Sequence, residues 1–149
     1  DDFVGQPRAG SGVGLSPGHA AAARRLRGAV ARAPFMVGGS TRVDSLVMQA
    51  LGERVCCKVG AEGMYCAALP EAGLGVAIKV DDGATARACE VVLAAVIEAF
   101  VRLRSDSERA LLAGLSDKTL RNWRGLVVGR LAAQASLRGL AGRANGAAV

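Results

Sequence analysis

The residues best suited to chemistry in this sequence lie around one lysine. Lys58 stands at the end of an apolar run, residues 54–59, and the glycine-rich segment GAEG follows at 60–63. An ammonium buried at the end of an apolar strand is costly unless it is paired or loses its proton, so such a lysine is more often functional than one on a loop. Glycines allow a backbone to approach a ligand closely. We therefore predict a site at Lys58, lined by Gly60 and Gly63.

The elements around this site are typical of an α+β fold. Connections of four residues join the apolar runs, which predicts three antiparallel strands at residues 54–59, 64–69 and 74–80. Apolar residues that recur at helical spacing predict helices at 18–32, at 41–51, from Asp82 or Thr85 to about Arg104, and at 107–115. We expect the long third helix to cover the sheet. Residues 126–129 fit either a last strand or a loop.

The net charge of +6 is concentrated after the last acidic residue, Asp117. Six of the 19 basic residues follow it, so residues 1–117 carry 13 basic and 13 acidic residues. A nucleic-acid partner needs a basic face, with aromatic side chains to stack on bases if it is single-stranded, and this end of the chain offers Trp123 alone. We therefore expect no nucleic-acid partner. Residues 131–149 read as a basic, disordered tail and residues 1–17 as a flexible segment.

Neither a membrane span nor a metal site is predicted. The most apolar segment, residues 91–101, is interrupted by Glu98 and is shorter than the roughly 18 residues that a span needs. None of the four cysteines has the paired spacing of zinc or redox motifs, and free thiols favour a reducing, cytoplasmic location. His19 lies near a helix start without an acidic or cysteine partner nearby in sequence, which favours a surface or capping role. We expect a soluble protein without a cofactor in this chain.

Several runs resemble one enzyme family. They are KVGAEG at 58–63, YCAALP at 65–70, GLG at 73–75 and KVDDGAT at 79–85, with VGG at 37–39 before Arg42 and Asp44, and NWRG at 122–125. Over about residues 20–129 the chain resembles the C-terminal half of the bacterial L-asparaginases of the Rhizobium etli type. The resemblance implies a serine β-lactamase-like fold, an antiparallel sheet flanked by helices, and hydrolysis of L-asparagine to aspartate and ammonia.

The catalytic motifs of that family are missing from these 149 residues. The resemblance places its serine-x-x-lysine element, a second serine and the residues associated with zinc in the N-terminal half. No serine here is followed by lysine at the required distance. We therefore expect residues 18–130 to be the C-terminal part of an asparaginase domain that is inactive alone. A homodimer, or a complementing N-terminal half, would be its protein partner.

The resemblance also suggests roles for the site residues. Lys58 would hold the substrate carboxylate or tune the nucleophile's proton, as the lysine of the lysine-threonine-glycine strand does in penicillin-recognising enzymes, although Val59 replaces the hydroxyl residue here. Glu62 would bind the substrate α-ammonium, unless it is a plain turn carboxylate. Arg42 is a candidate carboxylate fork and Asp44 its orienting partner, unless both are only first-turn charges of a helix.

Two other classes of function fit the same residues. A glycine-rich cleft without a nucleophile would serve a non-catalytic module that binds an amino acid. A sheet with helical cover and no pocket would be purely structural, and no amino acid would then change its thermal stability.

Overall fold

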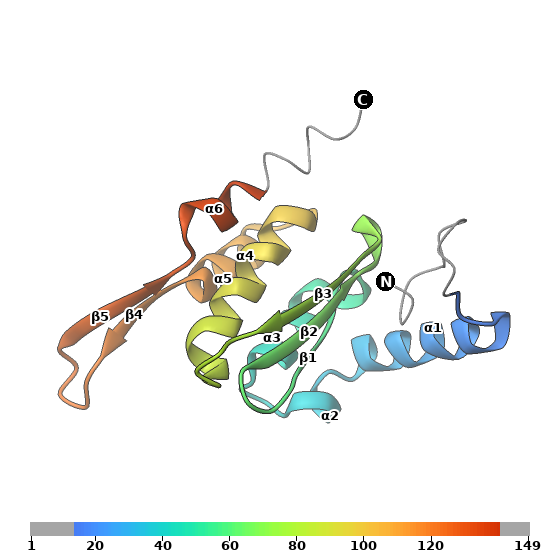
Figure 1. Ribbon diagram of the computed structural model, residues 1–149, viewed down its shortest axis with the longest axis horizontal. Coiled ribbons are helices and arrows are strands. Elements are labelled where there is room, and N and C mark those ends of the chain that lie inside the picture. The colour runs from blue at the N-terminus through green and yellow to red at the C-terminus, as the bar shows by residue number, and fades with distance from the viewer. Residues whose placement is uncertain (1–13, 141–149) are drawn as a thin grey trace. The chain divides into compact units, whose positions relative to one another are not determined.

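The computed structural model describes residues 14–140 and is a mixed helix and sheet structure, an α+β fold (Figure 1). The chain divides into two compact units. Unit 1 comprises Asp1–Gly60 and Tyr65–Ala77, and unit 2 comprises Ala61–Met64 and Ile78–Val149. Each unit is described by itself.

The helices of unit 1 begin with α1, Pro17–Arg32. Ser16 caps it, because the Ser16 hydroxyl accepts a hydrogen bond from the His19 amide, and a proline at the first position loses no helical bond. The predicted helix is thus confirmed, and His19 lies in its first turn, its ring Nδ1 3.1 Å from Ser16 Oγ. After it come the short α2, Phe35–Gly38, which the sequence did not predict, then α3, Val43–Leu51, and the 3₁₀ turn η1, Gly52–Arg54.

The predicted three-stranded sheet is confirmed. It consists of β1 (Cys56–Val59), β2 (Met64–Leu69) and β3 (Leu74–Lys79), in the order β1-β2-β3. β1 pairs antiparallel with β2, and Lys58 faces Cys66 in that register. The 3₁₀ turn η2, Pro70–Ala72, links β2 to β3, and so short a link requires antiparallel strands. The buried side chains of unit 1 come mainly from α3 and the first two strands: Val47, Met48, Leu51, Val55, Cys57, Tyr65 and Leu69.

Unit 2 is organised around α4, Glu90–Phe100. The predicted helix from Asp82 or Thr85 to Arg104 is shorter than expected: residues Thr85–Cys89 form the π-helical turn η3, and α4 ends at Phe100. The end of the predicted span belongs to the next helix. Glu108 accepts a hydrogen bond from the Arg104 amide at 2.7 Å, and Ser105 caps α5, Asp106–Ser116, so that this stretch belongs to α5. Whether α4 covers the sheet stays a prediction.

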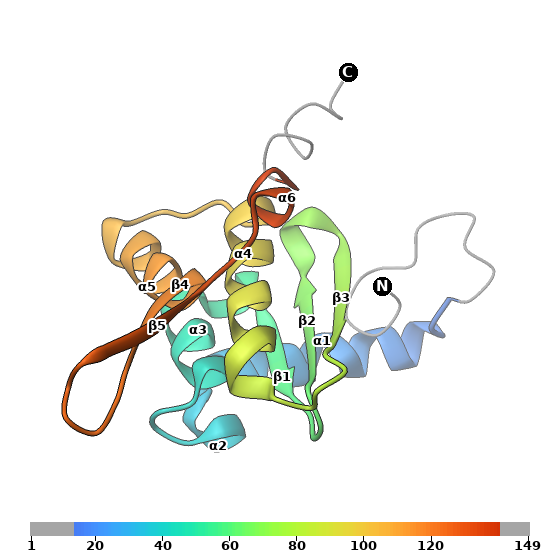
Figure 2. The ribbon, with the colours of Figure 1, turned by 60° about the vertical axis from the view of Figure 1, so that its left-hand side comes forward.

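The β4–β5 hairpin follows α5, with β4 at Asp117–Arg121 and β5 at Val127–Ala132 (Figures 1 and 2). The sequence left residues 126–129 open between strand and loop, and gave no sign of β4. At the tip, the side-chain oxygen of Asn122 accepts hydrogen bonds from two later amides, and Gly125 has a φ of 77°. The NWRG element therefore forms the turn of this hairpin.

Part of the predicted tail lies within the described residues. The described part of the predicted tail contains the last residues of β5 and the short helix α6, Ala135–Arg138. Ala133 is buried with Val91 and Ala95 of α4, and Leu131 and Leu137 pack against them. Residues 141–149 of the predicted tail, and 1–13 of the predicted N-terminal segment, lie outside the described residues, so both domain boundaries stay predictions. No helix within residues 14–140 has the length and apolar character needed to cross a bilayer.

Candidate active site

Asp44 is the centre of the charged cluster in unit 1. It lies in the first turn of α3, and its side chain is completely buried. The end of α2 is packed tightly on it, since a Cβ added at Gly38 would lie 2.6 Å from Asp44 Oδ1 and 2.6 Å from Ser45 Oγ. Only glycine fits at residue 38 without moving the carboxylate. This close approach fixes the position of Asp44.

Two backbone amides donate to the Asp44 carboxylate. The Ser45 amide donates to Oδ1 at 3.2 Å and the Val59 amide to Oδ2 at 3.5 Å. Because the first of these belongs to α3 and the second to the end of β1, one carboxylate joins a helix start to a strand end. The partial positive charge of a helix N-terminus also favours an anion at this place. A second link runs from Ser45 Oγ to the Pro34 carbonyl at 3.1 Å.

Two cations complete the cluster. Arg42 Nε lies 3.5 Å from Asp44 Oδ1, and Lys58 Nζ lies 3.5 Å from Asp44 Oδ2. The Lys58 ammonium also donates to the Val59 carbonyl at 3.2 Å. The structure thus brings together three of the residues that the sequence analysis singled out, Arg42, Asp44 and Lys58, from α3, the residue before it and β1.

The expectation of a buried ammonium at Lys58 is wrong. The Lys58 side chain is 49% exposed and the Arg42 side chain is 51% exposed, while Asp44 is the buried charge. The cause is strand alternation: neighbouring residues on β1 point to opposite faces, and Cys57 takes the buried face. The site is therefore a buried anion that holds two cations at the surface.

This arrangement suits the binding of a carboxylate. Each cation keeps one side against Asp44 and the other in contact with solvent, so a ligand can approach without displacing the pair. Arginine offers a planar fork of donors and lysine a compact point charge, and both form strong hydrogen bonds to ionised oxygens. The carboxylate of a free amino acid is a ligand of the right charge.

Cys57 does not supply a nucleophile to this cluster. Its thiol is buried and lies 3.9 Å from the Asp44 carbonyl oxygen. Burial raises the pKa of the Cys57 thiol strongly, and the nearby negative charge of Asp44 raises it further. Since the thiolate is the reactive form, a thiol that stays protonated is unreactive. Cys57 serves as a small core residue.

The other predicted residues are placed differently. Gly60 is exposed, directly after β1 in unit 1. Glu62 and Gly63 belong to unit 2, where Glu62 is exposed and takes a left-handed backbone conformation with a φ of 56°. The Lys79 ammonium donates a hydrogen bond to the backbone carbonyl of Glu62, so Lys79 contacts the backbone and not the Glu62 carboxylate. The roles proposed for Gly60, Glu62 and Gly63 toward a ligand stay predictions.

Gly63 forms the packed centre of what we call the Gly63 turn, residues 61–64. Its amide donates to Thr85 Oγ1 at 3.2 Å, and its carbonyl accepts from the Val80 amide at 2.9 Å and from the Cys89 thiol at 3.1 Å. A Cβ at Gly63 would lie 2.7 Å from the Val80 carbonyl oxygen, and its φ is 70°. Glycine is needed here for the fold of unit 2 itself.

Sequence reasoning missed what surrounds Asp44. The sequence indicates Gly38 only as part of a turn and Ser45 only as part of a helix. No spacing rule links either residue to Lys58. The signal that could have found them is the combination of a glycine pair, an aspartate in the first helical turn and a strand lysine. Within the described residues, no group of three His, Cys, Asp or Glu side chains could hold a metal ion.

Fold and cluster together describe an α+β protein in which a buried carboxylate holds two half-exposed cations. The chain belongs to the L-asparaginase II family, whose family model matches residues 7–133. The family is one of asparaginases, which are amide hydrolases. None of the curated proteins compared with the chain matches it.

Proposed function

We propose that this chain is the C-terminal portion of an L-asparaginase of the Rhizobium etli type, with a serine β-lactamase-like fold when complete. The complete domain would hydrolyse L-asparagine to L-aspartate and ammonia in the cytoplasm. The membership of the L-asparaginase II family supports the reaction class. The observation that carries the site assignment is the cluster in which buried Asp44 holds Lys58 and Arg42 at the surface, each at 3.5 Å.

In this proposal the cluster binds and orients the substrate. Arg42 and Lys58 receive the α-carboxylate, or Lys58 stabilises negative charge that develops on the amide oxygen during attack. Asp44 acts as a positioning residue, because it holds both cations and does not itself face a ligand. Gly60, which follows β1 in unit 1, would let the backbone approach the ligand.

The nucleophile of the proposed reaction is not assigned to this chain. Acyl transfer needs a nucleophile activated by an adjacent base, and the 149 residues contain no serine-x-x-lysine element. A complementing N-terminal half, or a second copy in a homodimer, would complete the site. Zinc, which the resemblance associates with the N-terminal half, finds no ligand set among the described residues, and no step of the proposal uses it.

A graft into an intact relative tests the proposal. Residues 20–129 replace the matching half of that relative, and release of ammonia from L-asparagine is measured before and after Lys58→Met. We expect kcat/KM to fall by roughly a hundredfold or more, as happens when one member of a catalytic unit is removed. Lys79→Met is the matched control, because Lys79 binds a backbone carbonyl, and it should stay within about threefold of the parent.

The outcomes of the graft separate clearly. Equal losses of kcat/KM for the two lysine variants, or no loss for Lys58→Met, would show that the site has been placed wrongly on the sheet.

The isolated chain, purified free of host asparaginase, should release no ammonia, and measurable turnover would contradict the assignment of the nucleophile to another segment.

One observation favours a second candidate, a non-catalytic module that binds an amino acid. The Asp44 cluster presents two cations to solvent without any need of a nucleophile. Isothermal titration of the isolated chain with L-asparagine and L-aspartate distinguishes the candidates. Binding that disappears with Lys58→Met, together with an inactive graft, would support the module over the enzyme.

A further inference from the structure

Helix α1 of unit 1 has an unbalanced distribution of charge. Its 16 residues include the arginines Arg24, Arg25, Arg27 and Arg32, and no acidic residue. Like charges on neighbouring positions of a helix destabilise it, and acidic residues spaced three or four positions away normally offset this. On α1 no acidic residue of the helix itself offsets the positive charge.

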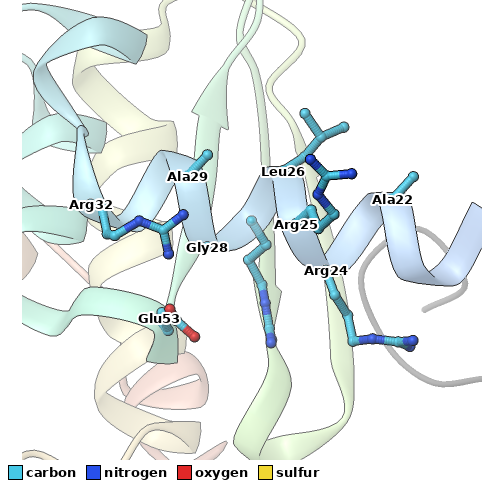
Figure 3. A pocket seen from close by; sticks show the side chains of 9 residues that line it. Ala22, Arg24, Arg25, Leu26, Gly28, Ala29, Arg32 and Glu53 are labelled. Carbon is cyan, nitrogen blue, oxygen red and sulfur yellow. The ribbon is translucent and has the colours of Figure 1, made fainter.

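The four arginines line a hollow of about 740 Å³ at the surface of α1 and η1 (Figure 3). Arg32 lies beside Glu53 at one end of the hollow, and Arg24 and Arg25 lie toward the other end. Gly28 is between them, and a Cβ there would lie 3.2 Å from Arg32 Nη1 and 3.5 Å from Glu53 Oε1. The glycine therefore keeps the middle of the hollow open.

Arg27 also lines the hollow, and in the sequence it lies between Arg24 and Arg32. Its Nε is buried and has no hydrogen-bond partner among residues 14–140. A buried donor without an acceptor costs free energy, and one on a charged group costs more than a neutral one. Glu53 is the single acid that lines the hollow in the described part of the chain, against four arginines. An external anion bound in the hollow would offset this excess of positive charge.

We propose that this hollow binds a small molecule that carries linked phosphate groups. The guanidinium fork matches the oxygens of phosphate in bidentate pairs, which favours phosphate over a single spherical anion. Residues 24 and 32 are eight positions apart, about 12 Å along a helix, which exceeds one phosphate and fits a chain of phosphates. The volume is within the range of roughly 300–1,000 Å³ usual for small-ligand sites.

Isothermal titration of the full chain at constant ionic strength tests the proposal, with inorganic phosphate, pyrophosphate, tripolyphosphate and ATP as probes. We expect pyrophosphate to bind roughly tenfold more tightly than inorganic phosphate, because additional guanidinium groups are engaged. ATP tighter than tripolyphosphate would identify a nucleotide as the source of the phosphates. Equal affinities would identify the phosphate chain alone.

Three variants make the test specific. Arg27→Gln should weaken pyrophosphate binding by roughly tenfold or more, since one of the four positive charges that line the hollow is lost. Glu53→Gln, which removes the acid from the lining, should tighten binding by about threefold or more. Arg124→Gln changes the net charge by the same amount as Arg27→Gln but lies in the turn of the β4–β5 hairpin, and it should leave the affinity within about twofold.

The same titrations can overturn the proposal. Equal weakening by Arg27→Gln and Arg124→Gln would show attraction by net charge alone. No tightening with Glu53→Gln, or pyrophosphate no tighter than inorganic phosphate, would show that the hollow is not a site for linked phosphates. None of these measurements depends on asparaginase turnover, so the proposed function can fail while this inference holds, and the reverse.

Discussion

The Asp44 cluster of unit 1 and the Gly63 turn of unit 2 come from the same stretch of family resemblance but are built in opposite ways. In the cluster a buried side-chain carboxylate holds two half-exposed cations, each at 3.5 Å. In the turn the amide and the carbonyl of Gly63 are both bonded within unit 2, the carbonyl to a buried thiol as well. One region presents charge to solvent and the other uses its polar groups in folding.

The difference shows which residues have hydrogen-bonding capacity left for a ligand. Lys58 has three N–H donors and makes two hydrogen bonds among the described residues, to Asp44 and to the Val59 carbonyl. Gly63 has one donor and one carbonyl, and both are engaged. Resemblance at the level of sequence includes both regions, while the contacts among the described residues leave one N–H donor of Lys58 free and engage both backbone groups of Gly63.

The largest expected effect on stability comes from Asp44→Ala. The change leaves the buried Ser45 amide without its acceptor, removes the acceptor of the Val59 amide and separates two cations from their partner. We expect a loss of about 3 kcal/mol in the free energy of unfolding, measured by urea titration.

Asp106→Ala is the control for this change. Asp106 also stands in the first turn of a helix and pairs with an arginine, but its side chain is fully exposed. An exposed pair contributes little, so we expect a change of about 0.5 kcal/mol or less. Equal effects of the two substitutions would mean that burial of Asp44 does not organise unit 1.

Gly63→Ala should have the next largest effect. The new Cβ would lie 2.7 Å from the Val80 carbonyl oxygen and would force a residue with a side chain to a φ of 70°. We expect about 2 kcal/mol or more of destabilisation. Gly73→Ala provides the comparison, because Gly73 has a similar φ of 64° but nothing within 4 Å, and should cost about 1 kcal/mol. If both cost the same, the close packing of the turn contributes nothing.

Much of the fold follows from local pattern. Glycine and proline punctuation located the three strands within two residues at each end, because turns of four residues leave little freedom in register. The Ser16-Pro17 start of α1 is equally local. The end of α4 was missed because it depends on Glu108, which draws residues 104–105 into the cap of the next helix. β4 was missed because DKTLR is polar and becomes a strand only by pairing with β5.

The candidate site shows a similar division. The types of residue, Lys58, Arg42 and Asp44, could be selected from the sequence. Which of them is buried could not, because that depends on the face of β1 that packs and on the approach of Gly38 to Asp44. The sign of the charge in the interior was therefore predicted wrongly.

A smaller difference in the free energy of unfolding should distinguish substitutions of Lys58 and Lys79. Because Lys58 pairs with a buried carboxylate, Lys58→Met should destabilise the chain, and a buried ammonium would have given the opposite sign. The loss should be about 1 kcal/mol or less, since Lys58 is half exposed and solvent screens the pair. Lys79→Met, at an exposed residue that bonds a carbonyl, should change the free energy of unfolding by about 0.3 kcal/mol or less. A stabilised Lys58→Met variant would contradict the assignment of Asp44 as the buried charge.

The smallest expected effect concerns the end of unit 2. Removal of residues 141–149, an acid-free segment rich in alanine and glycine, should leave the melting temperature unchanged within error.

A longer truncation, after Arg130, is the comparison. It also removes Leu131, Ala133 and Leu137, which pack with Val91 and Ala95 of α4. Uncovering this apolar face should lower the melting temperature by several degrees, at roughly 25 cal/mol per Å² of apolar surface exposed. If the two truncated chains melt at the same temperature as the full chain, the packing of residues 131–140 contributes no stability, and the disordered tail begins at residue 131 as the sequence predicts.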